Sequence, residues 1–168
     1  VDHVGARGGT YTVPASIKEM RKEIADKPIK YGVLTHHHSD HVPGAAAYAE
    51  EGATIITFEE NRQVVLKAAG NDQAKLEFVE DRMTLTDGDR TIELYNIGPT
   101  PHAENILIAY LPDQGIIFEA DHFPQPANGM IPPAVPATAA FARRLDELNL
   151  EYTKLVGAHS PGVASPED

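Results

Sequence analysis

One short run of residues constrains this chain more than any other feature. Residues 35–41 read THHHSDH, and they directly follow the apolar stretch YGVL at residues 31–34. Successive side chains alternate in extended backbone, so His36 and His38 should point the same way while His37 points the opposite way. The imidazoles of His36 and His38 can therefore converge on one metal ion.

The end of the same run offers ligands for a second ion. The chain turns after His38, which lets Asp40 and His41 reach an ion close to the first one. Zinc and other borderline metals accept both imidazole nitrogen and carboxylate oxygen. The run therefore predicts a paired metal site. The alternatives are a solvated histidine tract, of the kind that an expression tag leaves, and an isolated metal-scavenging loop.

Three further candidate ligands lie at positions of one kind, each just past a segment predicted as a strand. In layered α/β proteins, ligands bind beyond one end of the sheet, where the loops leave the strands. We therefore expect these loops to meet the histidine run at that end. The three residues are His102 after residues 91–97, Asp121 after residues 115–119 and His159 after residues 154–158.

The complete pattern resembles the metallo-β-lactamase-fold superfamily of metallohydrolases, whose signature is His-x-His-x-Asp-His followed by a distant His, Asp and His. All seven positions are filled between residues 27 and 161. The resemblance implies an α/β fold, the metallo-β-lactamase-like αββα sandwich. Gly44 matches a family glycine that would allow a tight turn into the next helix. The implied ligand set is His36, His38 and His102 for the first metal, Asp40, His41 and His159 for the second, and Asp121 as the bridge.

The chain also departs from the family pattern. Ala103 follows His102 where the family commonly has threonine, so the hydroxyl at that position is absent. His159 is preceded by Ala158, where the family commonly has glycine. Only 35 residues precede His36. We therefore expect that the sandwich lacks much of its N-terminal β-sheet and that the chain is N-terminally incomplete.

Composition fits one domain that acts on small molecules. With 42% hydrophobic residues, residues 1–168 suffice for a single sizeable core, and they are predicted to form one domain. The formal net charge of −11 argues against nucleic acid and against an anionic membrane as partners. The absence of cysteine excludes thiolate ligands, disulfides and iron–sulfur clusters. The cellular compartment stays open.

Hydrophobic spacing predicts alternating helices and strands. Thr57 and Glu60 form a capping-box pattern, and Gly70 should end that helix. Thr138 should cap a helix that carries Phe141 at a core position. Helices are expected over residues 15–26, 43–51 and 57–69 and after residue 138, and strands over residues 53–57, 83–86, 90–97 and 106–111.

Two segments are predicted to be irregular. Residues 123–136 hold five of the thirteen prolines, which predicts a loop beside the metals. Its Phe123, Met130 and Ile131 either contact the substrate or belong to a stiff connector. Residues 160–168 are expected to fray.

Two other histidines are expected to support the ligands. His37 should pack or form a hydrogen bond, with metal ligation as the alternative. His122, beside Asp121, should make a structural hydrogen bond, with donation to a substrate oxygen as the alternative.

The implied ligand set indicates that the protein catalyses hydrolysis. Two divalent ions would bring the pKa of a shared water near neutrality, so hydroxide is the expected nucleophile. Asp40 is the predicted catalytic residue, because it can hold this water and accept its proton. The expected cofactors are two zinc ions, with iron or manganese as alternatives. The expected substrate is a small ester, thioester, lactone or amide.

Two other functional classes stay open. A mononuclear iron dioxygenase of the same fold, acting on a persulfide, would use only the first metal's histidines and the bridging aspartate. A metal-stabilised binding module would have no activity. A homodimer that covers the incomplete sandwich is a further hypothesis.

Overall fold

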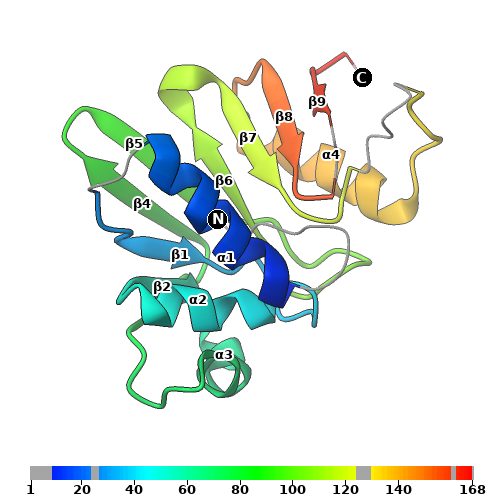
Figure 1. Ribbon diagram of the computed structural model, residues 1–168. Coiled ribbons are helices and arrows are strands. Elements are labelled where there is room, and N and C mark those ends of the chain that lie inside the picture. The colour runs from blue at the N-terminus through cyan, green and yellow to red at the C-terminus, as the bar shows by residue number, and fades with distance from the viewer. Residues whose placement is uncertain (1–8, 24–26, 124–129, 160–161, 168) are drawn as a thin grey trace. The chain divides into compact units, whose positions relative to one another are not determined.

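Helices and strands alternate over the first half of the chain, and the second half combines six strands with helix α4 (Pro136–Leu148), which confirms the predicted α/β class. A computed structural model describes residues 9–23, 27–123, 130–159 and 162–167. The chain divides into two units, Val1–Val79 and Glu80–Asp168 (Figure 1). That residues 1–168 form one domain stays a prediction.

The first unit is built on a three-stranded parallel sheet. Its strand order is β1-β2-β3, and the helices fill the connections between the strands. Two short 3₁₀ helices, η1 and η2, precede α2 and α3. The elements are α1 (Gly9–Glu23), β1 (Tyr31–Val33), η1 (Val42–Gly44), α2 (Ala45–Glu50), β2 (Thr54–Thr57), η2 (Glu59–Asn61), α3 (Arg62–Ala69) and β3 (Leu76–Phe78).

An apolar cluster fixes the end of β1, where the histidine run begins. Leu34 is fully buried in it together with Ile55 of β2 and Val65 of α3. The Leu34 N–H donates to the Ile56 carbonyl at 2.9 Å. Full burial of one such side chain stabilises the fold by about 1.5–3 kcal/mol. The residue just before the predicted ligands is therefore held by both packing and hydrogen bonding.

Helix α1 differs from its prediction. It begins at Gly9 instead of residue 15, so Pro14 lies inside the helix. Ile17 packs against the cluster as expected, but Met20 is 38% exposed, so the predicted core stripe is wrong there. Residues 24–26, the predicted end of this helix, lie outside the described residues.

The capping-box prediction is wrong. Thr57 ends β2, and its hydroxyl accepts a hydrogen bond from Asn61 Nδ2 at 3.3 Å. Phe58 occupies the cap of η2, because the helical turn begins only at residue 59. Gly70 ends α3 with φ 63°, as predicted. Strand β3 was not predicted.

Gly44 matters for close packing and not for a tight turn. Its φ of −60° is ordinary helical backbone, so the conformational reason is wrong. A Cβ at this position would lie 2.7 Å from Val13 Cγ2. Glycine therefore lets α1 approach the segment that follows the histidine run.

The second unit contains a six-stranded sheet in the order β4-β5-β6-β7-β8-β9. Neighbouring strands are antiparallel except β7 and β8, which are parallel and are connected through α4. Parallel pairing aligns Glu119 with Gly157, so the chain leaves both strands at one edge of the sheet. The elements are β4 (Arg82–Asp87), β5 (Arg90–Asn96), β6 (Leu107–Leu111), η3 (Pro112–Gln114), β7 (Ile116–Glu119), α4 (Pro136–Leu148), β8 (Lys154–Gly157) and β9 (Val163–Ala164).

Helix α4 packs on this sheet through Phe141 and Leu145, both buried against the cluster that contains Ile117. The predicted Thr138 cap is wrong, because Val135 precedes the helix. The Thr138 hydroxyl instead donates to the His122 carbonyl at 2.6 Å. The Thr138 hydroxyl therefore makes a tertiary contact and does not cap the helix.

The C-terminal prediction is partly wrong. Val163 and Ala164 form β9, paired with β8, where a frayed tail was expected. Ser160, Pro161 and Asp168 lie outside the described residues, as do residues 124–129 of the proline-rich loop. Residues 130–135 are irregular, as predicted.

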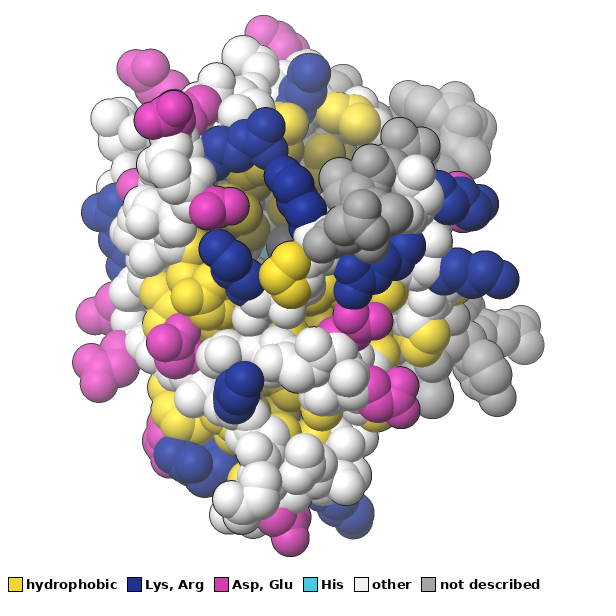
Figure 2. Space-filling model, turned by 60° about the vertical axis from the view of Figure 1, so that its left-hand side comes forward, with side chains coloured by type: hydrophobic (Ala, Val, Ile, Leu, Met, Phe, Trp, Pro, Cys, Tyr) yellow, Lys and Arg dark blue, Asp and Glu magenta, His cyan; other side chains and the backbone are white. Residues whose placement is uncertain are grey.

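Charged side chains of both signs occur together on the surface drawn in Figure 2, interspersed with apolar ones. The exposed large apolar residues of the second unit include Met130 at 69% and Val163 at 57%. Within the described part of the chain, no helix combines the length and the apolar character needed to cross a bilayer.

Candidate metal centre

The first unit carries the histidine run at the end of β1. His36 is fully buried, and its Nδ1 lies 3.1 Å from the Thr35 hydroxyl, also buried. His38 is half-buried, with its ring centroid 4.4 Å from that of His36. One ligand atom from each lies within 4.8 Å of the other. The predicted convergence of these two imidazoles is confirmed.

His37 is exposed, unlike its neighbours. Alternation of the side chains is therefore confirmed, and the expectation that His37 packs in the interior is wrong, whereas a hydrogen bond from His37 stays a prediction. Its ring lies 4.9 Å from the His38 ring and 6.4 Å from the His36 ring, between centroids.

A tight turn forms at the end of the histidine run. The backbone N–H groups of His41 and Val42 both donate to the His38 carbonyl at 3.1 Å. The turn brings the His41 ring to 4.2 Å from the His36 ring, between centroids. His41 is buried, and its Nε2 lies 3.6 Å from Oδ2 of Asp40. The first unit therefore offers two adjacent ligand pairs.

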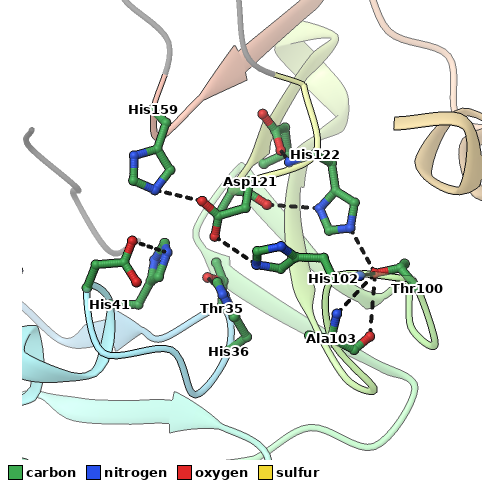
Figure 3. A network of polar contacts seen from close by, with 12 residues as sticks. Thr35, His36, His41, Thr100, His102, Ala103, Asp121, His122 and His159 are labelled. Atoms are coloured by element: carbon green, nitrogen blue, oxygen red, sulfur yellow. Dashed lines mark hydrogen bonds and ion pairs between the residues drawn. The ribbon is translucent and has the colours of Figure 1, made fainter. Parts of the chain in front are cut away.

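In the second unit, one carboxylate lies between two imidazoles. Asp121 Oδ2 is 3.3 Å from His102 Nε2, and Asp121 Oδ1 is 2.6 Å from His159 Nε2 (Figure 3). Each carboxylate oxygen of Asp121 therefore lies against a different histidine. A carboxylate with this arrangement could bridge two ions.

These distances fit metal ligation. Two nitrogen or oxygen ligands about 2.05 Å from a tetrahedral ion lie roughly 3.3 Å apart. The His102–Asp121 separation of 3.3 Å matches that value. The His159–Asp121 separation of 2.6 Å is a charge-assisted hydrogen bond, which would lengthen around an ion. The donor set of imidazole and carboxylate suits zinc, iron or manganese.

Asp121 has a strained backbone. Its φ is 68°, a left-handed value that costs a residue with a side chain on the order of 1 kcal/mol. Among the described non-glycine residues only Asn149 shares a positive φ, and it ends α4. The turn at Asp121 must therefore be held by its surroundings.

Glu119 stabilises this turn through a hydrogen bond from the backbone. It is buried at the end of β7, and its Oε2 accepts the backbone N–H of His122 at 2.8 Å. Burial raises the pKa of Glu119 to about 7, and hydrogen bonds from the backbone of His122 and Phe123 oppose that rise. Glu119 was not predicted from the sequence. Its one signal was a charged residue inside the apolar segment IIFEA.

His122 makes structural hydrogen bonds, as predicted. It is fully buried, with Nδ1 2.9 Å from the Ala120 carbonyl and Nε2 3.1 Å from the Thr100 hydroxyl. Burial lowers the pKa of His122, which favours the neutral ring. Thr100 was also missed, since nothing local distinguishes its hydroxyl.

Comparison with known proteins identifies the family of this chain. A family model described as "Metallo-beta-lactamase superfamily" matches residues 8–159. The 2,4-dinitroanisole O-demethylase subunit alpha of Nocardioides sp. (strain JS1661) is 25% identical over 130 residues, which cover 73% of this chain. The chain spans only 39% of that relative's length.

Solved structures share the fold. A metallo-beta-lactamase from Pontibacter korlensis has a TM-score of 0.68 at 22% identity, covering 91% of this chain and 71% of that one. A flavodiiron protein from Giardia intestinalis has a TM-score of 0.61 at 19% identity, covering 94% of this chain and 43% of that one. The predicted metallo-β-lactamase-like fold is therefore confirmed.

Proposed function

Because this chain belongs to the metallo-beta-lactamase superfamily, we propose that it is a metal-dependent hydrolase of a small ester, thioester, lactone or amide. The observation that carries the proposal is Asp121, whose two oxygens lie against two different imidazoles, His102 and His159. A carboxylate so placed can be shared by two cations. The strained backbone at Asp121 supports a functional role, since strain of this kind gathers at functional sites.

We propose two zinc ions as the cofactors. The assignment requires the ligands of the two units to come together around them, with Asp121 shared. Neutral imidazole and carboxylate suit zinc, and they leave iron and manganese as alternatives. The first ion would be held by His36, His38 and His102, and the second by Asp40, His41 and His159.

Such a pair of ions, when bound, supplies hydroxide at neutral pH by lowering the pKa of water. Asp40 is the proposed catalytic residue. Its side chain is 42% exposed, and its Oδ2 lies 3.6 Å from Nε2 of the buried His41, so solvent water can reach a carboxylate that lies beside a proposed ligand. It would orient the attacking water and accept its proton.

The test combines metal content with hydrolysis. Protein stripped with a chelator and reloaded with zinc should hold about two ions per chain and should cleave an aryl ester, a thioester or a lactone. Asp40→Asn should lower kcat by about 10²–10⁴-fold, because the amide cannot accept a proton. His37→Ala is the matched control, since this exposed residue is assigned to neither ion.

The outcomes separate the alternatives. Zinc uptake without turnover of any ester, thioester, lactone or amide would favour the binding module. A single iron with oxygen consumption on a persulfide would favour the dioxygenase. Failure to bind metal at all would refute all three functions.

A second candidate reaction is hydrolysis of an electron-poor aryl methyl ether. It is supported by the similarity to the 2,4-dinitroanisole O-demethylase subunit alpha. Hydroxide would add to the ring carbon that bears the methoxy group, and the C–O bond to methoxide would break. The products would be a phenolate and methanol. Release of yellow 2,4-dinitrophenolate from 2,4-dinitroanisole tests this reaction directly, and no release would remove it.

We further propose a small molecule, not a nucleic acid or a membrane, as the binding partner. The surplus of 25 acidic over 14 basic residues supports this choice. The homodimer stays a hypothesis. Sedimentation at micromolar concentration tests it, and a monomer there would reject it.

A further inference from the structure

A histidine that the metal assignment does not use connects two of the three segments that carry candidate ligands in the second unit. His122 is fully buried, and each of its four polar groups has a hydrogen-bond partner. The main-chain partners are Glu119 Oε2 at 2.8 Å for the N–H and the Thr138 hydroxyl at 2.6 Å for the carbonyl. The ring partners are the Ala120 carbonyl at 2.9 Å and the Thr100 hydroxyl at 3.1 Å.

These partners define the protonation of the ring. A carbonyl oxygen only accepts, so Nδ1 of His122 must carry the proton that it donates to Ala120. In the neutral imidazole Nε2 is then an acceptor, and the Thr100 hydroxyl, which also lies 3.4 Å from the Ala103 carbonyl, is close enough at 3.1 Å to donate to it. His122 thereby links the Asp121 turn to the loop that carries His102.

Thr100 organises the other end of this link. Its hydroxyl oxygen accepts the backbone N–H groups of His102 at 3.2 Å and of Ala103 at 3.3 Å. Its own N–H donates to the Ala103 carbonyl at 2.9 Å. Thr100 thus ties together the backbone of the loop that carries His102, from a position two residues before it.

We propose that Thr100 and His122 form a hydrogen-bonded bridge that fixes His102 at ligand distance from Asp121. This inference rests on the proposed function, because it takes His102 and Asp121 as ligands of one ion. Both bridge residues are positioning residues. Partners that orient metal ligands in this way commonly change metal affinity about 10–100-fold when they are removed.

The test measures zinc affinity by competition with a chromophoric chelator. Thr100→Val keeps the shape of the side chain but removes the donor for His122 and the acceptor for two amides. The first ion should bind about 10–100-fold more weakly, while the affinity for the second ion should change less. Thr100→Ser keeps the hydroxyl and should restore the affinity. Thr153→Val is the matched control, because its hydroxyl lies at 3.4 Å from the Gly115 carbonyl, at the opposite end of β7 and β8.

The two proposals fail separately. If the wild-type protein takes up no zinc, the proposed function fails. If the wild type binds two ions and a folded Thr100→Val protein binds both equally well, only the bridge is refuted. Nitrogen NMR of the wild-type histidines gives a readout that does not depend on a variant's folding. The bridge requires the Nδ1–H tautomer of His122, and an Nε2–H tautomer would overturn it.

Discussion

Asp121→Asn separates metal binding from folding in one substitution. Asparagine has the same shape as aspartate and also tolerates positive φ, so the turn with φ 68° should survive. The loss of charge removes the ion pairs with His102 and His159, whose side chains are 24% and 33% exposed. A pair this exposed contributes about 1 kcal/mol or less. The metal-free variant should therefore be nearly as stable as the metal-free wild type.

The effect of zinc should differ strongly between the two proteins. At a free zinc concentration of 100 times Kd, one bound ion stabilises the folded state by about 2.7 kcal/mol, and two ions by about 5.4 kcal/mol. For a chain of this size about 1 kcal/mol raises Tm by roughly 2–4 °C. Zinc should therefore raise the wild-type Tm by about 10–20 °C.

In the proposed centre Asp121 is shared, so its loss should weaken the binding of both ions. If each Kd rises about 100-fold, the same zinc concentration equals Kd, and each ion contributes only about 0.4 kcal/mol. The variant's Tm should then rise by roughly 2–3 °C.

Thermal melts by circular dichroism, with and without zinc, measure this difference. Asp113→Asn is the matched control, because it makes the same chemical change at an exposed residue of η3. It should keep the full zinc effect. A metal-free Asp121→Asn protein of normal stability that gains as much from zinc as the wild type would refute the shared role of Asp121.

Three further predictions concern the fold that supports the site. Glu119→Ala leaves the buried N–H of His122 without its acceptor and should lower the free energy of unfolding by about 1–3 kcal/mol in urea titrations; an unchanged midpoint would contradict the role of Glu119. Burial, together with a hydrogen bond to Glu93, raises the pKa of Tyr95 to about 12, from 10.0. Since the folded state holds this proton more tightly, stability should be complete below pH 10 and should fall as pH rises toward 12. Tyr95→Phe should flatten that fall, and an equal slope in both proteins would exclude Tyr95 as its cause. Leu34→Ala should cost about 2–5 kcal/mol because Leu34 is fully buried, and a loss below about 1 kcal/mol would mean that the cluster re-packs around the change.

The ligand run could be predicted because its geometry is local. Alternation in extended backbone placed His36 and His38 on one side and His37 on the other, and the structure confirms that arrangement. The parallel strands β7 and β8 were likewise readable as apolar segments that end just before Asp121 and His159.

The capping predictions failed because a hydroxyl can be used by a distant partner. Thr138 fitted the pattern of a helix cap, yet its hydroxyl donates to the carbonyl of His122, 16 residues away. Thr57 fitted a capping box, but its hydroxyl accepts from Asn61. Local propensity could not rank these contacts, because tertiary structure decides which donors and acceptors meet.

The same limit explains why Glu119 and Thr100 were missed, although both support the candidate ligands of the second unit. A carboxylate with two imidazole neighbours needs a turn at Asp121 that its own backbone disfavours. Glu119 and Thr100 stabilise that turn through hydrogen bonds to His122, from which they lie 3 and 22 residues away in sequence. The ligands are recognisable by residue type and spacing, whereas their supports are recognisable only by what they touch. Substitutions at the supports should therefore change metal affinity while every ligand remains in place.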